Sequence, residues 1–491
     1  MTLKRKATAG VFWVGVSTGA NQFFNLLIKY VLARMLDPAH FGLVSMAYLA
    51  IDFLQMFREM GFASALIYHK GDVRKAADTT FVTILLMATG LFLLAFLGAP
   101  LVAVFFRSPE LTNVLRALSV NILISALGQV QLALLAKNLA FRERLLPDLV
   151  PTVAFGVVAI SLALMGMGVW SLVIAKIVDS ALTSLLYWLV VPWWRPRLRF
   201  DRQEARELFD YGKHIVGSSL LIYFITNLDN TFVGRVLGEE QLGYYGIAYT
   251  QANVPATQIS RIIGQVLFPA YSKMQDDVTA LRGVYFRTTK YVSMVSIPLS
   301  VGVIAFAGPF INALYGARYA QAIVPLQWLG VYGLFRAVAV NMGSVFKAGG
   351  KPQWLTYIAV LRLAVMGTLL YPATIYYGIV GVSVLSALVA AADFVLSAVL
   401  TNRIIHGKLA DYLRALAMPT LLSLATAALG VWAYARMASQ HGFIALVMAG
   451  TLMATCYGLS LLVLDSDMRR AMISLRHELE LAGRKWMGDA D

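Results

Sequence analysis

"LARMLDPAHFGLVSMAYLA" occupies residues 32–50, and "VGRVLGEEQLGYYGIAYTQ" occupies residues 233–251. A shift of 201 positions aligns the two segments and produces five identities: Arg34 with Arg235, Leu36 with Leu237, Gly42 with Gly243, Ala47 with Ala248 and Tyr48 with Tyr249. Each segment joins the end of one apolar stretch to the start of the next. We therefore interpret the pair as one structural element that occurs twice in an internally repeated chain.

The composition places the chain in a membrane. Of its 491 residues, 59% are hydrophobic and only 14% are charged, whereas soluble proteins carry about 25% charged residues. The mean hydropathy is +0.69. Apolar residues form long runs at 78–106, 146–194 and 415–465, and runs of about 18 or more predict membrane-spanning helices. The single cysteine excludes an intramolecular disulfide. We expect an all-α integral membrane protein.

The apolar runs divide into about fourteen transmembrane helices. Their predicted ranges are 9–33, 40–58, 78–106, 111–136, 146–167, 169–192, 211–236, 242–270, 284–308, 321–346, 353–375, 378–402, 411–436 and 442–464. In the connection before residue 211, Asp201 followed by Glu204 resembles a capping box and predicts the start of a short surface helix.

Basic residues support this division and set the orientation. With the N-terminus in the cytoplasm, 30 of the 41 Lys and Arg residues fall on the cytoplasmic side and 6 near the outer side. This asymmetry is typical of inner-membrane proteins, whose cytoplasmic loops collect positive charge. It explains the net charge of +15 without a nucleic-acid partner. We expect both termini to be cytoplasmic, and the basic loops to contact anionic membrane lipids.

Six predicted helices separate Arg34 from Arg235, and an even number gives both copies the same orientation across the membrane. The chain is therefore predicted to contain two parallel six-helix repeats and two extra C-terminal helices. The predicted parts are an N-lobe at 1–194, a linker at 195–210, a C-lobe at 211–405, helices 13 and 14 at 406–465, and a cytoplasmic amphipathic tail at 466–491. Parallel repeats of this kind favour two bundles with a cavity between them.

The first helix of each half carries polar residues. Ser17, Asn21, Asn25 and Lys29 recur every four residues and share one side of the first helix. The corresponding helix at 211–236 contains Asp229. Such stripes are unfavourable against lipid, so we expect them to line a shared polar cavity.

Charges predicted within the membrane are the strongest functional candidates, because placing one at mid-bilayer costs at least about 2.5 kcal/mol. The predicted substrate-cavity residues are Asn25, Lys29, Asp229, Arg261, Arg336 and Arg362. An excess of guanidinium and ammonium groups favours an anionic passenger, since guanidinium binds phosphate through two hydrogen bonds. The alternative for Arg261 and for Arg336 is that each pairs with another group in a structural role and does not face a cavity.

The other membrane charges have separate interpretations. Asp229 and Asp393 are candidates for ion coupling or for structural counter-charges. Lys176 and Asp179 are three residues apart on one helix and are expected to pair. Arg34 and Arg235 lie at the outer ends of their helices, where we expect gate or headgroup residues.

Motifs for enzymatic chemistry are missing from the sequence. It contains no GxxxxGK[ST], no HExxH and no nucleophile elbow, so we expect neither an enzyme nor a cofactor. "LDSDM" at 464–468 resembles a DxD metal motif, but its position at the end of the last span argues against a metal site.

Five stretches resemble a known family. They are "LARMLDPAHFGLVSMA", "FREMGFASALIYHKGD", "LDNTFVGRVLGEEQLGYYGIAY", "IIGQVLFPAYSKMQDD" and "VFKAGGKPQW". They resemble the Wzx and WzxC-like flippases of the polysaccharide transporter family, within the MATE-like (MOP) exporter superfamily. The resemblance implies two MATE-like lobes that open alternately. It also implies export of an undecaprenyl-diphosphate-linked oligosaccharide for capsule, exopolysaccharide or O-antigen, with a polysaccharide polymerase and copolymerase as candidate partners. Asp229 matches an aspartate position typical of the family.

Three other functions remain open on the sequence alone. A MATE-type cation-coupled multidrug exporter shares the implied fold, although a cationic cavity disfavours it. A peptidoglycan-precursor flippase would carry a chemically similar lipid. A membrane enzyme that modifies lipid-linked sugars is the third alternative, and it usually presents a sizeable periplasmic loop that this chain lacks.

Overall fold

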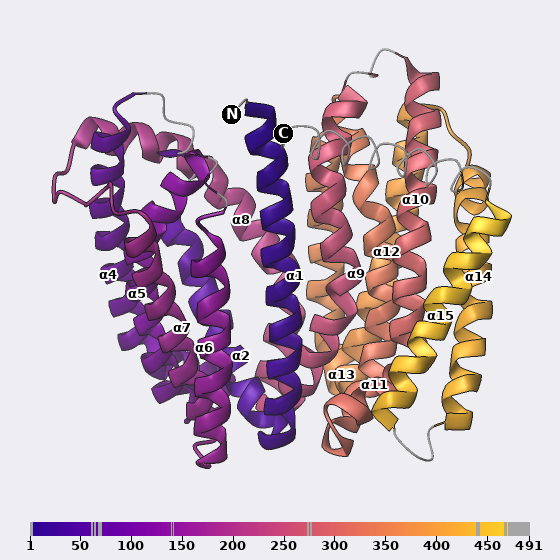
Figure 1. Ribbon diagram of the computed structural model, residues 1–491, viewed down its shortest axis with the longest axis horizontal. Coiled ribbons are helices and arrows are strands. Elements are labelled where there is room, and N and C mark those ends of the chain that lie inside the picture. The colour runs from indigo at the N-terminus through magenta and orange to yellow at the C-terminus, as the bar shows by residue number, and fades with distance from the viewer. Residues whose placement is uncertain are drawn as a thin grey trace, which may run out of the picture. The chain divides into compact units, whose positions relative to one another are not determined.

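The computed structural model describes residues 3–59, 62, 65–66, 71–138, 140, 142–272, 274, 277–437, 442–465 and 469. Side chains are described for these residues except 3–16, 58–59, 208, 210–219, 255–270 and 272. Every regular element in the described part of the chain is helical (Figure 1). The helices are α1 Leu3–Met35, α2 Pro38–Glu59, α4 Val73–Phe106, α5 Leu111–Lys137, α6 Leu145–Leu164, α7 Val169–Val190, α8 Arg202–Leu237, α9 Glu239–Ser272, α10 Val278–Ala305, α11 Ala307–Leu314, η1 Ala317–Ala322, α12 Ile323–Ala348, α13 Gln353–Ile405, α14 Leu409–Met437 and α15 Gly442–Leu464.

The all-helical membrane architecture expected from composition is confirmed. Ten of the described helices are long and apolar enough to cross a membrane, and each of the fourteen predicted ranges overlaps a helix. The number of spans, fourteen, stays a prediction. The amphipathic tail at 466–491 lies outside the described residues apart from residue 469.

The elements α13, α11 and η1 differ from the predicted helix ranges. The ranges predicted at 353–375 and 378–402 form the single element α13, broken at Gly378 (φ 57°, ψ −147°). A straight helix of 53 residues would be about 80 Å long, far more than the roughly 30 Å hydrocarbon layer. The break is therefore compatible with two spans. The connection predicted at 309–320 is partly helical, because α11 and η1 occupy it.

The predicted short surface helix at Asp201 is wrong in its extent. Asp201 does cap a helix, since its side chain accepts hydrogen bonds from the backbone N–H groups of Gln203 and Glu204. That helix continues without interruption to Leu237 as α8. Gly212 and Gly217 lie where the surface part was expected to end, and α8 continues through both of them.

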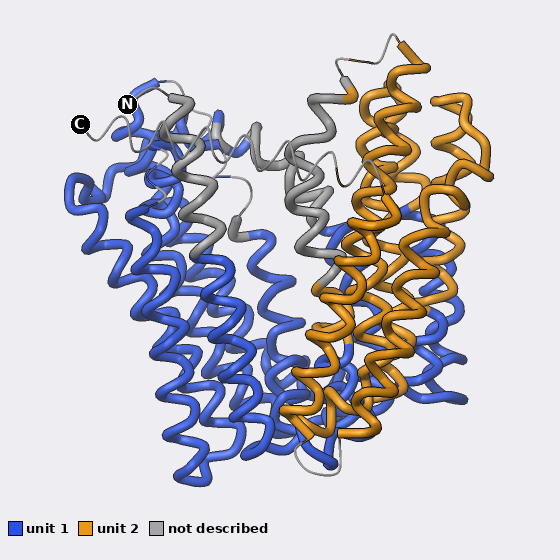
Figure 2. Tube along the Cα trace, turned by 45° about the vertical axis from the view of Figure 1, so that its right-hand side comes forward, with its two compact units in different colours: residues 1–248, 314–322, 359–385 blue, residues 249–313, 323–358, 386–491 orange. Residues whose placement is uncertain are grey.

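The chain divides into two compact units (Figure 2). Unit 1 comprises residues 1–248, 314–322 and 359–385, and unit 2 comprises 249–313, 323–358 and 386–491. In unit 1, α5 packs on α4 and α7, α6 packs on α1 and α7, and α2 contacts α4, α5 and α8. In unit 2, α10 packs on α12 and α14, and α14 packs on α15. These units are not the same division as the predicted lobes, whose boundaries stay a prediction.

The two repeated turns pack against each other inside unit 1. A Cβ added at Gly42, near the start of α2, would overlap the carbonyl oxygen of Glu239, at the start of α9. A Cβ added at Gly243 would overlap the carbonyl oxygen of Pro38. Pro38 and Glu239 are themselves related by the 201-residue shift, so the contact is reciprocal. Glycine recurs in the repeat because each copy leaves room for the backbone of the other.

Candidate functional site

Asp229 is a buried carboxylate in α8 that accepts hydrogen bonds at both of its oxygens. The residue is 5% exposed. Its Oδ2 accepts a hydrogen bond from the Tyr245 hydroxyl at 2.7 Å, and its Oδ1 accepts one from the backbone N–H of Asn230 at 2.8 Å. Arg362, on α13, interacts with it electrostatically. Two of the predicted site residues thus lie in unit 1 within electrostatic reach of each other.

Tyr245 was missed as a site residue in the sequence. Asp229 and Tyr245 lie on successive helices that meet at Gly238, which has φ 87° and separates α8 from α9. In a helical hairpin, residues at similar distances from the turn lie at similar depths. Counting outward from the turn would therefore have pointed to Tyr245 as a partner for Asp229.

Arg336 is held in unit 2 by two polar neighbours. Its Nη1 donates to Asn253 Oδ1 at 3.0 Å and to the Tyr332 hydroxyl at 3.1 Å. The Tyr332 ring in turn packs beside that of Tyr249, with centroids 6.2 Å apart. Both hydrogen bonds use Nη1, so they orient the guanidinium from one edge. This structural pairing was the alternative to a cavity position in the sequence analysis.

The polar stripe on α1 divides into two parts. The Ser17 hydroxyl donates to Asp148 on α6 at 3.3 Å, and Asn21 Oδ1 accepts from the Thr152 hydroxyl at 2.8 Å. These two residues therefore join α1 to α6, and their place along a shared polar cavity stays a prediction.

Asn25 and Lys29, one and two turns further along α1, are exposed on the surface of unit 1. Residues spaced by four rotate gradually around a helix, so Asn25 and Lys29 do not point in the same direction as Ser17 and Asn21. Asn25 and Lys29 are thus the solvent-accessible residues of the stripe, and their role in a cavity stays a prediction.

The predicted gate residues both lie over aromatic rings. Arg34 is exposed, with its guanidinium carbon 5.1 Å from the Tyr30 ring centroid. Arg235 is half-buried, 5.3 Å from the Phe105 centroid. Its Nη1 is enclosed and has no hydrogen-bond partner among the residues that the structure describes.

The remaining predicted site residues are less closely defined. Arg261 lies on the backbone of α9, but its side chain is outside the described residues. Asp393 lies half-buried on α13, in its unit 2 part. Their predicted roles stay predictions.

Two ion pairs account for four other charged residues. The expected pairing of Lys176 with Asp179 is confirmed, at 2.7 Å. Asp465, the first aspartate of the DxD-like motif, pairs with Lys290 on α10. Within the described residues no group of three His, Cys, Asp or Glu side chains could hold a metal ion.

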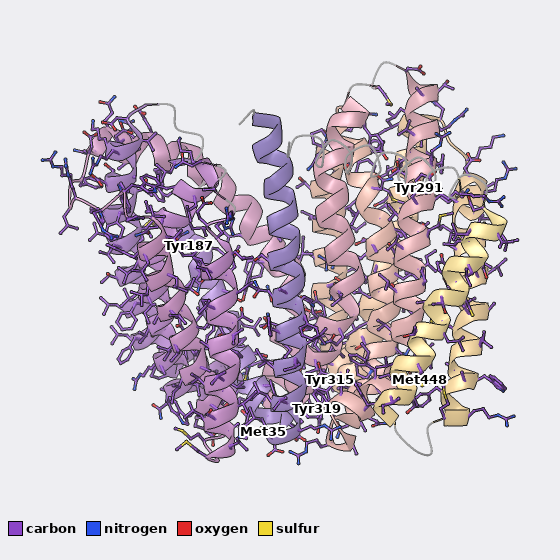
Figure 3. The ribbon with its side chains drawn as sticks, viewed as in Figure 1. Met35, Tyr187, Tyr291, Tyr315, Tyr319 and Met448 are labelled. Atoms are coloured by element: carbon purple, nitrogen blue, oxygen red, sulfur yellow. The ribbon has the colours of Figure 1, made fainter. Side chains whose placement is uncertain are left out.

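A cluster of polar and aromatic contacts surrounds the repeated turns in unit 1, and the sequence analysis did not identify it. The Tyr319 hydroxyl, in η1, donates to the Leu36 carbonyl at 3.0 Å, and Arg318 pairs with Asp37 at 2.9 Å. Figure 3 shows Tyr315 and Tyr319 at the same end of the molecule as Met35, and the two tyrosine rings are 5.7 Å apart. The cluster thus ties η1 to the first repeated turn.

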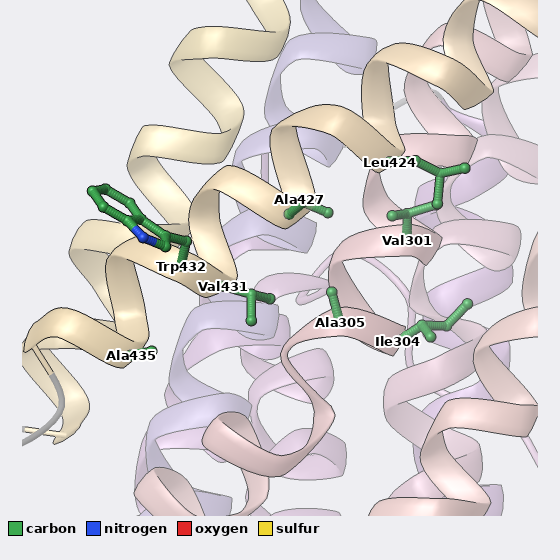
Figure 4. Close-up of a pocket in the computed structure, with 9 residues that line it drawn as sticks. Val301, Ile304, Ala305, Leu424, Ala427, Val431, Trp432 and Ala435 are labelled. Atoms are coloured by element: carbon green, nitrogen blue, oxygen red, sulfur yellow. The ribbon is translucent and has the colours of Figure 1, made fainter.

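An apolar hollow lies between α10 and α14 in unit 2 (Figure 4). Its volume is about 540 Å³, and its lining includes Val301, Leu424 and Trp432. No charged residue lines it, so it offers nothing to bind a sugar or a phosphate. We exclude it as the site for a polar passenger.

Comparison with known proteins assigns the chain to a family. The polysaccharide biosynthesis protein family matches residues 31–324. The teichuronic acid biosynthesis protein TuaB of Bacillus subtilis is 27% identical, over 90% of this chain and 91% of its own. The lipopolysaccharide biosynthesis protein WzxC of Escherichia coli is 26% identical, over 87% of each chain. The succinoglycan biosynthesis transport protein ExoT of Rhizobium meliloti is 27% identical, over 75% of each.

Solved structures with the same fold are transporters. The lipid II flippase MurJ in an inward closed conformation matches 93% of this chain and 99% of its own, with a TM-score of 0.72 at 15% identity. A multidrug resistance MATE family transporter in an inward-facing conformation matches 78% and 95%, with a TM-score of 0.61 at 18% identity. The chain has the fold of these MOP-superfamily transporters, and by sequence it belongs to the polysaccharide biosynthesis protein family.

Proposed function

We propose that this protein is a flippase that moves an undecaprenyl-diphosphate-linked oligosaccharide across the bacterial inner membrane for surface polysaccharide synthesis. The observation that carries the proposal is membership of the polysaccharide biosynthesis protein family, with relatives aligned over most of the chain. One of them, ExoT, is named a transport protein. The fold shared with the lipid II flippase MurJ supports transport of a lipid-linked sugar by alternating access.

The cationic residues suit an anionic passenger. Lys29 and Asn25 are exposed on α1, so they are available to the sugar or the diphosphate. Arg336 is oriented by hydrogen bonds from its Nη1 to Asn253 and Tyr332, and we propose that its guanidinium contacts a phosphate oxygen. A guanidinium held in this way loses less conformational entropy when it binds an oxyanion. Arg261 is retained as a further cavity residue.

Asp229 and Arg362 form a second element of the proposed mechanism. In the structure the carboxylate and the guanidinium interact with each other. A diphosphate that binds Arg362 would compete with Asp229, and the carboxylate would then need a proton or a cation as compensation. This exchange would link passenger binding to ion binding. Asp393 is a second candidate for ion coupling.

The arrangement in the cell follows from the sequence-based orientation. We propose that the N- and C-termini are cytoplasmic, that the lobes at 1–194 and 211–405 open alternately, and that Arg34 and Arg235 act at the outer gate. A polysaccharide polymerase and copolymerase would then act on the product at the outer face.

Deletion of the gene tests the function. We expect surface polysaccharide to be lost and the lipid-linked oligosaccharide to accumulate, with both effects reversed by the wild-type gene. Persistence of surface polysaccharide in the deletion strain would overturn the proposal. Drug sensitivity with intact polysaccharide would instead support a multidrug exporter, and loss of viability would support a peptidoglycan-precursor flippase.

Complementation by single variants tests the residues separately. Lys29→Ala, Arg261→Ala, Arg336→Ala and Arg362→Ala should reduce export at equal protein level. The control is Arg436→Ala, since Arg436 stacks on Trp432 and is not one of the proposed cavity residues. Full export by all four variants would refute the cavity assignment while leaving the function intact.

A further inference from the structure

A pocket with two arginines lies in unit 1 between α4 and the first turns of α8. Its volume is about 580 Å³. Arg202 and Arg206 line one part of it, and Phe62, Met87, Phe200 and Phe209 line the rest. Both arginine side chains are exposed, and neither has a hydrogen-bond or ion-pair partner in the described part of the chain. The pocket thus combines two available guanidinium groups with an apolar wall.

The arginines share one face of α8 because of their spacing. Residues 202, 206 and 209 are related by steps of four and three, which places two arginines and Phe209 in one row along the helix. Two of the nearby acidic side chains are engaged elsewhere. Asp201 caps the helix and pairs with Lys75 at 2.9 Å, and Glu207 accepts a hydrogen bond from Gln203. The row itself therefore presents positive charge.

The wall formed by Phe200 is held in place by polar contacts to α4. The backbone N–H of Arg197 donates to Asp78 Oδ1 at 3.2 Å, and that of Asp201 donates to Thr79 Oγ1 at 3.3 Å. Asp78 and Thr79 are buried at the start of α4. The segment that carries Phe200 is thus fastened at both ends, so the pocket is formed before any ligand binds.

We propose that this pocket binds an anionic phospholipid of the surrounding membrane. The phosphate lies between Arg202 and Arg206, and the first part of an acyl chain lies against Phe200 and Phe209. Guanidinium groups suit phosphate oxygens because they present paired N–H donors. The segment 193–210 is on the side of the membrane where basic residues gather, and that leaflet carries anionic lipid.

This site is independent of the transported passenger. A direct hydrogen bond to a charged group contributes at least about 1 kcal/mol, so removal of both guanidinium–phosphate contacts should weaken binding about 30-fold. Because one wall of the pocket is apolar, we expect a phospholipid to bind more tightly than inorganic phosphate.

The test uses the full-length protein purified in detergent and titrated with phosphatidylglycerol, with bound lipid counted by native mass spectrometry. We expect Arg202→Gln combined with Arg206→Gln to lose affinity about 30-fold. The control combines Arg197→Gln with Arg199→Gln, which removes the same charge from exposed residues that do not line the pocket. The control should bind as the wild type does. Equal losses in both double variants would overturn the site, since they would indicate a general charge effect.

Two further ligands complete the test. Phosphatidylcholine, which has no net charge, and inorganic phosphate, which has no acyl chain, should each bind the wild type at least 10-fold more weakly than phosphatidylglycerol. Comparable binding of either would overturn the proposal. Thermal unfolding of each variant without added lipid shows whether the fold is kept. If the pocket variant unfolds early, Phe209→Ser replaces it and should weaken phosphatidylglycerol binding while leaving inorganic phosphate unchanged.

Discussion

Replacement of Gly42 by alanine tests whether the two repeated turns are packed backbone to backbone. An added Cβ would overlap the Glu239 carbonyl oxygen and would lie 3.0 Å from the backbone nitrogen of Gly243. Both neighbours are main-chain atoms, so no change of rotamer relieves the overlap. The starts of α2 and α9 would have to move apart.

The expected cost follows from two opposing effects. Forcing extra volume into a packed site costs about 1–3 kcal/mol. Alanine in place of glycine within a helix stabilises by about 0.5–1 kcal/mol. Because the overlap is with rigid backbone, the cost falls toward the upper end of its range. We expect a net loss of about 1–2 kcal/mol.

The matched control is Gly90→Ala on α4, where no atom outside the local helix lies within 4 Å of the added Cβ. Thermal unfolding of the full-length chain in detergent should give a lower Tm for Gly42→Ala than for the wild type, and an equal or higher Tm for Gly90→Ala. Gly243→Ala disturbs the same contact, so the double variant should lose less than the sum of the two single losses. A Gly42→Ala protein that melts at or above the Gly90→Ala protein would refute the proposed close packing.

Three further predictions concern single contacts. Lys290→Ala should destabilise unit 2 by about 3 kcal/mol, because the Asp465 carboxylate, which is 3% exposed in the native pair, loses that cation. Thermal unfolding measures the loss, and an unchanged Tm would contradict the prediction. Tyr245→Phe should reduce export while protein level is kept, because it removes a hydrogen bond from Asp229; unchanged export in the complementation assay would exclude a role for that bond. The backbone N–H of Glu204 and then the ammonium group of Lys75 lower the pKa of Asp201. The stability that Asp201 contributes should therefore be present above about pH 4 and be lost as pH falls further. Asp201→Asn, which keeps a capping oxygen, should lose less stability in acid when unfolding is measured across this pH range.

Local contacts were predictable from the sequence. Lys176 and Asp179 pair as their three-residue spacing indicates, since neighbours on one helix turn meet whatever the tertiary fold. The cap at Asp201 was predicted for the same reason. The length of the helix that it starts was not, because the sequence around 211 was interpreted as a boundary between surface and membrane.

Contacts between distant segments were not predictable in this way. Arg362 and Asp229 were both selected as membrane charges, but nothing in their spacing indicated that they interact. Ser17 and Asn21 were expected on the same open face as Lys29, yet they bond to α6. The periodicity of a helix shows which residues share a face, and it does not show which helix covers that face.

The sequence by itself determined the all-helical membrane class, the positions of most helices and the existence of the repeat, because apolar run length, charge asymmetry and internal identity are properties of the chain alone. Only the tertiary structure decided what the repeat does at its turns. Gly42 and Gly243 were recognised as equivalent positions, and their reciprocal contact with Glu239 and Pro38 became visible only once α2 and α9 were placed. A close contact between two main chains depends on where the two helices meet in space. A glycine in the sequence indicates only that such a contact is sterically allowed.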